Sequence, residues 1–193
     1  PTTHLAEFIS TTSTTEITDN VLHEAKRTLI NVIAVALSAS NDPSADILLN
    51  WDGKQHSTRM TTVIGKGQAH LERAALVNGY LAHLQDYDDT HFPTILHPSA
   101  PIWPAVLAIA EEENLSGSQT LTAFSIGAET ACNLAMSVHP WHYNAGWHIT
   151  GTVGVFGAAA AAANALHLSP ENTEQTLGLA GTHSAGVRET FGT

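Results

Sequence analysis

Apolar residues recur along most of this chain at the spacing of an α-helix. Over residues 19–40, hydrophobic side chains follow one another at steps of three and four, which places them on one face of a helix. Asp19 is suited to the N-cap of this helix because its carboxylate can accept from a free backbone N–H. The members of the apolar face are Val21, Ala25, Leu29, Val32 and Ala36.

Further helices are indicated in the first half of the chain. Pro43 opens a stretch that runs through Trp51, and Asp52 with Gly53 is expected to end it. Residues 68–85 have the apolar spacing of a further helix. Residues 61–64 are all β-branched, which favours a short extended segment.

Proline and polar residues predict two long breaks in this pattern. Residues 86–104 contain four prolines, so we expect mostly loop there before a helix at about 105–113. A second loop, rich in aromatic and polar residues, is predicted over 139–147.

Helical signals continue in the second half. Ser116 and Gln119 have the spacing of a capping box, which opens a helix to about residue 137. Ser169 followed by Pro170 marks the start of a last helix, reaching about residue 181. Between them, residues 150–166 form an Ala- and Gly-rich helix, whose glycines at every third position allow close approach of a second helix. The predicted fold class is all-α.

Composition narrows the range of functions. The chain has 193 residues with 18 Asp+Glu against 7 Lys+Arg, a formal charge of −11, and 43% hydrophobic residues. This is a globular composition, and its charge disfavours nucleic acid and anionic membranes as partners. No transmembrane or secretory segment is indicated, and Cys132 is the only cysteine. We therefore expect a cytoplasmic protein, or a mitochondrial one in a eukaryote.

The first predicted loop gathers groups suited to acid–base chemistry. Asp86, Asp88 and Asp89 lie within four residues, and His91 and His97 follow. Carboxylates and imidazoles this close shift one another's pKa values, so such a set can supply an acid and a base. The alternative is an acidic turn after a helix, whose side chains only cap backbone groups.

The second loop ends near the start of the small-residue helix. His148 and Thr150 lie where free N–H groups and the helix dipole favour an anion, so they are candidates to hold a carboxylate. In the alternative interpretation, tryptophans anchor the loop and the histidines are idle; we favour this for His139 and His142.

Other chemistries find less support. His91 or His97 with the neighbouring aspartates can ligate a metal, but neither HExxH nor EF-hand spacing is present, and we expect no metal site. No P-loop, dinucleotide fingerprint or nucleophile elbow occurs. Cys132 lies among apolar helical residues, which indicates a packed thiol rather than a nucleophile.

Several motifs together resemble the MmgE/PrpD family, which includes 2-methylcitrate dehydratase, cis-aconitate decarboxylase and iminodisuccinate epimerase. The resemblance covers roughly residues 5–193. Its motifs are ERAALVNG (72–79), DYDDT (86–90), HPS (97–99), GWHxTG (146–151) and LGLAG (177–181).

The resemblance implies a large helical domain, a smaller α+β lid domain, an active site between them, and a homodimer that needs no metal or organic cofactor. Residues 1–193 would form the N-terminal part of the helical domain. The family chain is more than twice this length, so we expect the lid and an active-site lysine outside this chain, and the chain alone to be inactive.

Carried onto this sequence, the resemblance and the two loops together select six site residues. His97 is the leading acid/base candidate, tuned by a loop carboxylate such as Asp86, with His148 as a second donor. Thr90 would donate a hydrogen bond to a substrate carboxylate. The catalytic candidates are His97, Asp86 and His148, and the substrate-binding candidates are Thr90, Tyr87 and Thr150.

The function expected from this set is a cofactor-independent lyase. It would act on a small di- or tricarboxylate by dehydration or decarboxylation beside a carboxylate, with His/Asp acid–base chemistry. The alternatives are an epimerase of an iminodisuccinate-like dicarboxylate and a non-enzymic helical dimerisation module.

Overall fold

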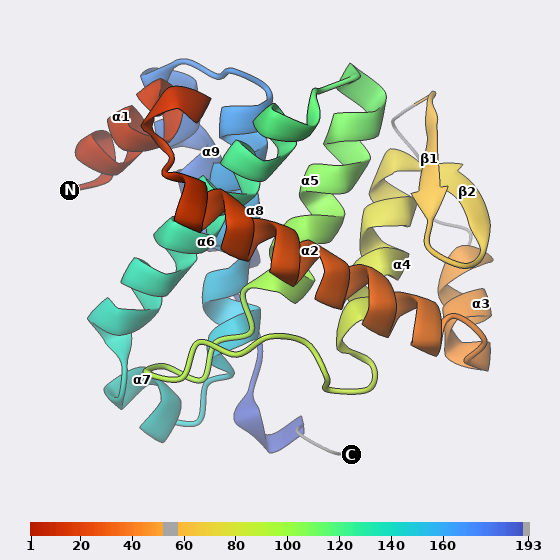
Figure 1. Cartoon of the computed structure of the whole chain (residues 1–193). Coiled ribbons are helices and arrows are strands. Elements are labelled where there is room, and N and C mark those ends of the chain that lie inside the picture. Colours follow the sequence, from red (N-terminus) through yellow and green to blue (C-terminus); the bar gives the residue numbers. More distant parts are fainter. Residues whose placement is uncertain (52–57, 191–193) are drawn as a thin grey trace.

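The computed structural model describes residues 1–51 and 58–190, and in them helices make up most of the chain, with one short β-hairpin (Figure 1). This confirms the predicted all-α class. None of the described helices is both long enough and apolar enough to cross a membrane. The helices are α1 (Thr2–Thr11), α2 (Asp19–Ala39), α3 (Pro43–Leu49), α4 (Leu71–His83), α5 (Ser99–Glu113), α6 (Gly117–Val138), α7 (Trp141–Asn144), α8 (Ile149–Ala165) and α9 (Pro170–His183).

The long helix α2 runs obliquely across one face of the molecule, over α4, α5 and α6 (Figure 1). Its apolar face is largely buried, with Ala25, Val32 and Ala36 fully inside. Val21, at the start of the predicted face, is 45% exposed. The N-cap is Thr18, whose hydroxyl accepts from the Val21 N–H, so the helix begins one residue earlier than predicted.

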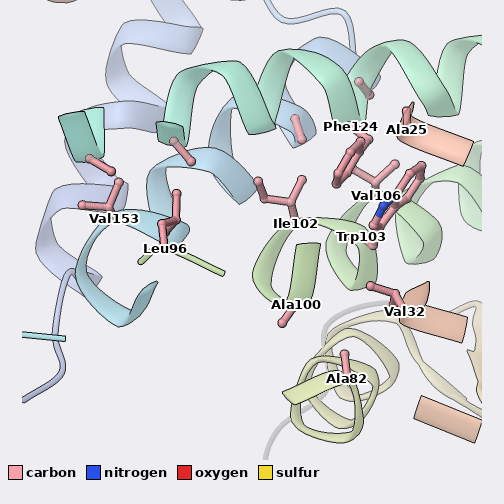
Figure 2. Packing of buried hydrophobic residues seen from close by; sticks show 14 of the residues in the cluster. Ala25, Val32, Ala82, Leu96, Ala100, Ile102, Trp103, Val106, Phe124 and Val153 are labelled. Carbon is pink, nitrogen blue, oxygen red and sulfur yellow. The ribbon is translucent and has the colours of Figure 1, made fainter. Parts of the chain in front are cut away.

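Helix α5 supplies the centre of the largest core cluster (Figure 2). Trp103 is fully buried and stacks on Phe124 of α6, with ring centroids 4.0 Å apart and planes 6° from parallel. The indole N–H donates to the Thr28 hydroxyl of α2 at 2.9 Å. The polar tip of this tryptophan is therefore satisfied while its rings join three helices.

Helices α6 and α8 cross closely because both carry glycine at the crossing. A Cβ on Gly157 would lie 2.7 Å from Ile102, 2.8 Å from Ala131 and 3.0 Å from the carbonyl of Gly127. A Cβ on Gly127 would lie 2.6 Å from the carbonyl of Gly157. The predicted role of the small-residue helix, close approach by a second helix, is confirmed.

The prediction of loop through residue 104 is wrong at its end, because α5 already begins at Ser99. Pro101 lies in the first turn, where a backbone N–H has no intrahelical partner to lose. The carboxylate of Asp89 accepts from both the N–H and the hydroxyl of Ser99, at 3.1 and 2.7 Å, and so caps the helix from the preceding loop. Pro104 lies inside the helix and removes one further hydrogen bond.

Other differences concern short or weakly patterned segments. The extended piece at 61–64 is confirmed as β1 (Met60–Val63), but it pairs antiparallel with β2 (Gly67–His70), residues predicted to begin a helix. Helix α1 was not predicted, and α7 lies in a predicted loop. The helix predicted to run through Trp51 ends earlier, because α3 stops at Leu49 and Asn50 is its C-cap. Asp52 and Gly53, the predicted stop, lie outside the described residues.

Candidate active site

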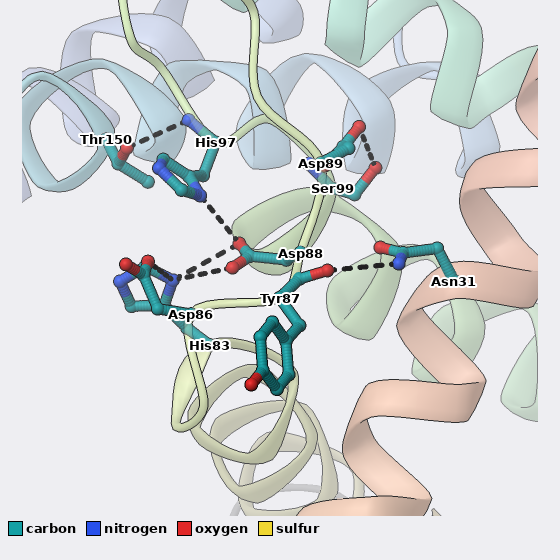
Figure 3. Close-up of polar contacts among 9 residues, drawn as sticks. All are labelled: Asn31, His83, Asp86, Tyr87, Asp88, Asp89, His97, Ser99 and Thr150. Carbon is teal, nitrogen blue, oxygen red and sulfur yellow. Dashed lines mark hydrogen bonds and ion pairs between the residues drawn. The ribbon is translucent and has the colours of Figure 1, made fainter.

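The two predicted loops meet at the start of α8. The first loop leaves α4 after His83 and returns to α5 at Ser99, and the second leads into α8 at Ile149. The hydroxyl of Thr150 accepts a hydrogen bond of 3.0 Å from the backbone N–H of His97 (Figure 3). Segments more than fifty residues apart in sequence therefore share one site.

A buried carboxylate forms the centre of this site (Figure 3). The side chain of Asp88 has no solvent exposure, and it lies between two imidazoles. Nδ1 of His83 is 3.0 and 3.2 Å from the two carboxylate oxygens, and Nδ1 of His97 is 3.2 Å from Oδ2. The rings of His83 and His97 meet edge to face, with centroids 5.2 Å apart.

The charges of this network stabilise one another. Burial raises the pKa of Asp88, but the hydrogen bond from His83 and the approach of His97 outweigh it and bring the pKa to about 2. The same hydrogen bond raises the pKa of His83, against the opposing effect of burial. Asp88 is therefore ionised at neutral pH, and His83 holds a proton more readily than a free imidazole.

His148 is the third imidazole of the site. It is the N-cap residue of α8, and its backbone N–H donates to the Gly186 carbonyl at 3.1 Å. Its ring is inclined by 29° to that of His83, with centroids 6.4 Å apart. Burial lowers the pKa of His148, and the positive charges of His83 and His97 lower it further. This imidazole therefore stays neutral more readily than that of His83.

The loop that carries these groups is shaped by two residues in the left-handed region. Asp86 has φ of 57° and Ile95 has φ of 54°, a conformation that a β-branched residue rarely adopts. The turn before His97 is closed by the N–H of Ile95 donating to the His91 carbonyl at 2.8 Å and by a bridge between His91 and Leu96. Such strained residues cluster at functional sites, where the surrounding structure holds them in place.

Some of the predicted site residues lie in this network of imidazoles and carboxylates, and others lie at its edge or on the exposed surface of the loop. The structure brings His97, His148 and Thr150 together, and Asp86 reaches the rim, with Oδ1 4.0 Å from Nδ1 of His83. The carboxylate that contacts His97 is Asp88 rather than Asp86.

The remaining two candidates lie on the exposed part of the loop. Tyr87 is 74% exposed, and its carbonyl accepts from the amide of Asn31 on α2. Thr90 is exposed as well. Thr150 is buried and bonded to the backbone of His97, so its hydroxyl orients that residue.

Sequence reasoning did not select His83, and it gave Asp88 no role of its own. The signal was the pattern of His83, Asp86 and Asp88 at the predicted end of a helix. A helix that ends at His83 lets the chain turn back, so that a carboxylate five residues later reaches the imidazole.

A pocket of about 370 Å³ lies apart from the imidazoles, between α2 and α6. Asp89 lines it, and burial raises the pKa of that carboxyl. Cys132 lines it too, and burial raises the pKa of the thiol to about 11, so the thiolate is scarce at neutral pH. The pocket contains neither His97 nor His148, and it is not the acid–base centre.

Comparison with known proteins identifies the family of the chain. The sequence model of the MmgE/PrpD N-terminal domain matches residues 3–193. The chain belongs to the MmgE/PrpD family. The match confirms the resemblance inferred from the motifs.

Three curated relatives are named as cis-aconitate decarboxylases or as a protein like them. The chain is 28% identical to a cis-aconitate decarboxylase-like protein, oryM, of Aspergillus oryzae, over 96% of this chain and 40% of that protein. It is 29% identical to human cis-aconitate decarboxylase, over 87% of this chain and 36% of the relative. The decarboxylase of Aspergillus terreus is 26% identical, over 96% and 39%. The chain thus spans about two fifths of these relatives.

Proposed function

We propose that the protein to which this chain belongs is a cofactor-independent lyase that decarboxylates a small di- or tricarboxylate of the cis-aconitate type. The observation that carries the proposal is the buried Asp88 carboxylate between His83 and His97, beside His148 at the start of α8. The names of the relatives favour decarboxylation over dehydration and epimerisation.

The proposed chemistry needs one positioned proton donor. Loss of CO₂ breaks a carbon–carbon bond and leaves its electron pair on the remaining skeleton, which must then be protonated. His97 donates that proton as an imidazolium, with its Nδ1 held 3.2 Å from Oδ2 of Asp88. The proton is replaced from solvent after each turnover.

Anionic groups of the substrate are held by the other imidazoles. His83, with its raised pKa, supplies positive charge at a site in a protein whose formal charge is −11. His148, with its lowered pKa, donates one N–H as a neutral ring. Distant surface carboxylates matter less, because physiological salt screens exposed charges beyond about 8 Å.

The test uses the complete protein and follows cis-aconitate, 2-methylcitrate and iminodisuccinate separately by NMR. We expect conversion of cis-aconitate to a decarboxylated product and a rate lower by ~10²–10⁴-fold in His97→Gln. The matched control is His4→Gln, whose side chain is 87% exposed on α1. Unchanged turnover in His97→Gln would reject the assignment, and turnover of iminodisuccinate alone would favour an epimerase.

We propose in addition that the complete protein is a homodimer. Ile30, Ile33 and Leu37 are 67%, 41% and 55% exposed along one face of α2, and an apolar face of this kind supports an interface. Light scattering of the complete protein tests this, and a monomer at micromolar concentration would contradict it.

A further inference from the structure

Two imidazoles and two carboxylates converge at the end of α4 and in the loop after it. One ligand atom from each of His83, Asp86, Asp88 and His97 lies within 4.8 Å of the other three. Nitrogen from imidazole and oxygen from carboxylate are donors that Zn²⁺ accepts, usually four at a time. The group therefore has both the composition and the number of ligands of a zinc site.

The distances are close to those that such an ion imposes. With zinc–ligand bonds of about 2.0–2.1 Å, neighbouring ligand atoms of a tetrahedral site are about 3.3 Å apart. Oδ2 of Asp88 lies 3.2 Å from Nδ1 of His83 and 3.2 Å from Nδ1 of His97. Asp86 lies slightly further out, with Oδ1 4.0 Å from Nδ1 of His83, and its side chain is 76% exposed and has room to close the gap.

The ring nitrogen of His97 is an independent observation. Its Nδ1 is buried and lacks a partner in hydrogen-bond geometry; its contact with Oδ2 of Asp88 at 3.2 Å is an ion pair when the ring is protonated. A buried polar atom without a hydrogen bond costs free energy unless another partner satisfies it. A metal ion between His97 and Asp88 would be such a partner.

The charge of the group also suits a dication. As zinc ligands both imidazoles must give up any proton they hold at Nδ1, so metal binding releases protons, and the four side chains then carry the two negative charges of Asp86 and Asp88. The side chain of Asp88 is fully buried, so water does not stabilise its charge. One divalent ion neutralises the set while both rings act as ligands.

We propose that His83, Asp86, Asp88 and His97 bind one Zn²⁺ ion. The ion is coordinated by the ring nitrogen of His97, so that this imidazole no longer serves as the proton donor. Zinc therefore inhibits the complete protein, a consequence that rests on the proposed function. Zinc binding itself does not rest on it, because it requires only the four side chains.

The experiment is calorimetric titration of the complete protein with ZnCl₂ at neutral pH, without substrate. We expect one ion per chain, and an affinity at least ~10-fold lower in His83→Gln, since even groups outside the ligand shell contribute that much. His83 is 40% exposed, so this replacement is compatible with the fold, which far-UV circular dichroism checks. His4→Gln, on exposed α1, should bind as the wild type does.

A second readout uses Co²⁺ in place of Zn²⁺. Visible absorption of bound Co²⁺ should appear with the wild-type chain and disappear with His97→Gln. Absence of saturable zinc binding, equal affinity in wild type and His83→Gln, or Mg²⁺ binding as tight as Zn²⁺ would each overturn the proposal. Since no substrate is present, such a failure leaves the proposed function standing.

Discussion

The hydroxyl of Thr150 accepts a hydrogen bond from the backbone N–H of His97. This contact joins the first turn of α8 to the first loop, which connects α4 to α5 and carries Asp86, Asp88 and Asp89. Thr150 is 8% exposed, so the contact is shielded from water. It holds the backbone from which the His97 imidazole reaches Asp88. The first loop and the start of α8 act as one site through this bond.

Replacing Thr150 by valine removes that acceptor at nearly constant shape. The N–H of His97 then loses its partner, which we expect to lower the free energy of unfolding by about 1–3 kcal/mol. Thr150→Ser keeps the hydroxyl and should retain most of the stability. Urea denaturation of this chain measures both, and equal stability of the two variants would show that the hydrogen bond is not needed.

His83 and His148 should titrate in a definite order. The hydrogen bond to Asp88 raises the pKa of His83, while burial and two neighbouring imidazoles lower that of His148. NMR titration of the ring protons should therefore find His83 losing its proton at a higher pH than His148. In Asp88→Asn the charged acceptor is lost, and the pKa of His83 should fall. A reversed order would contradict the described network.

Asp88 should make stability depend on pH in the acid range. Its pKa is about 2 in the folded chain against an ordinary value of 3.8, so the ionised form stabilises the fold above pH 3.8. This contribution, about 2 kcal/mol, is lost as the pH falls from 3.8 towards 2. Urea denaturation should show Asp88→Asn less stable than wild type near neutral pH, with a smaller difference at pH 3. A constant difference would exclude this linkage.

Local signals in the sequence predicted much of the helical framework. Ser116 and Gln119 form the expected capping box, and Ser169 caps α9 ahead of Pro170. These signals succeed because a cap is decided by a few neighbouring residues. The second strand β2 was missed although its hairpin with β1 is local in sequence, because Gln68 and Ala69 have little preference for a strand and fit a helix as well.

The family motif at 72–79 contains residues that hold neighbouring secondary-structure elements together rather than residues of the candidate site. Asn78 accepts from the Ile64 N–H at 2.9 Å and donates to the Thr62 carbonyl at 2.8 Å, which fixes the hairpin on α4. Arg73 donates to the carbonyls of Leu48 and Leu49 at the end of α3. Sequence order alone cannot tell such residues from site residues, because only the fold shows what they contact.

The same limit applies to the site. The first loop was recognised from its composition, yet the sequence could not decide which of three neighbouring carboxylates meets His97. The choice depends on the left-handed conformation of Asp86, which turns the chain so that Asp88 lies inside and Asp86 lies outside.

The crossing of α6 and α8 should tolerate a single added methyl group poorly. In Gly157→Ala the new Cβ would lie 2.7 Å from Ile102 and 2.8 Å from Ala131, closer than packed atoms allow. We expect a loss of about 1–3 kcal/mol in the free energy of unfolding, since neighbouring helices must move apart. The matched control is Gly178→Ala in α9, where a Cβ meets nothing within 4 Å.

The control should change stability in the opposite direction. Alanine is favoured over glycine inside a helix by roughly 0.5–1 kcal/mol, so Gly178→Ala should raise the free energy of unfolding by about that amount. Thermal or urea denaturation of the two variants beside the wild type makes the comparison. Equal effects at positions 157 and 178 would show that the α6–α8 contact is looser than described, because only that contact distinguishes the two sites.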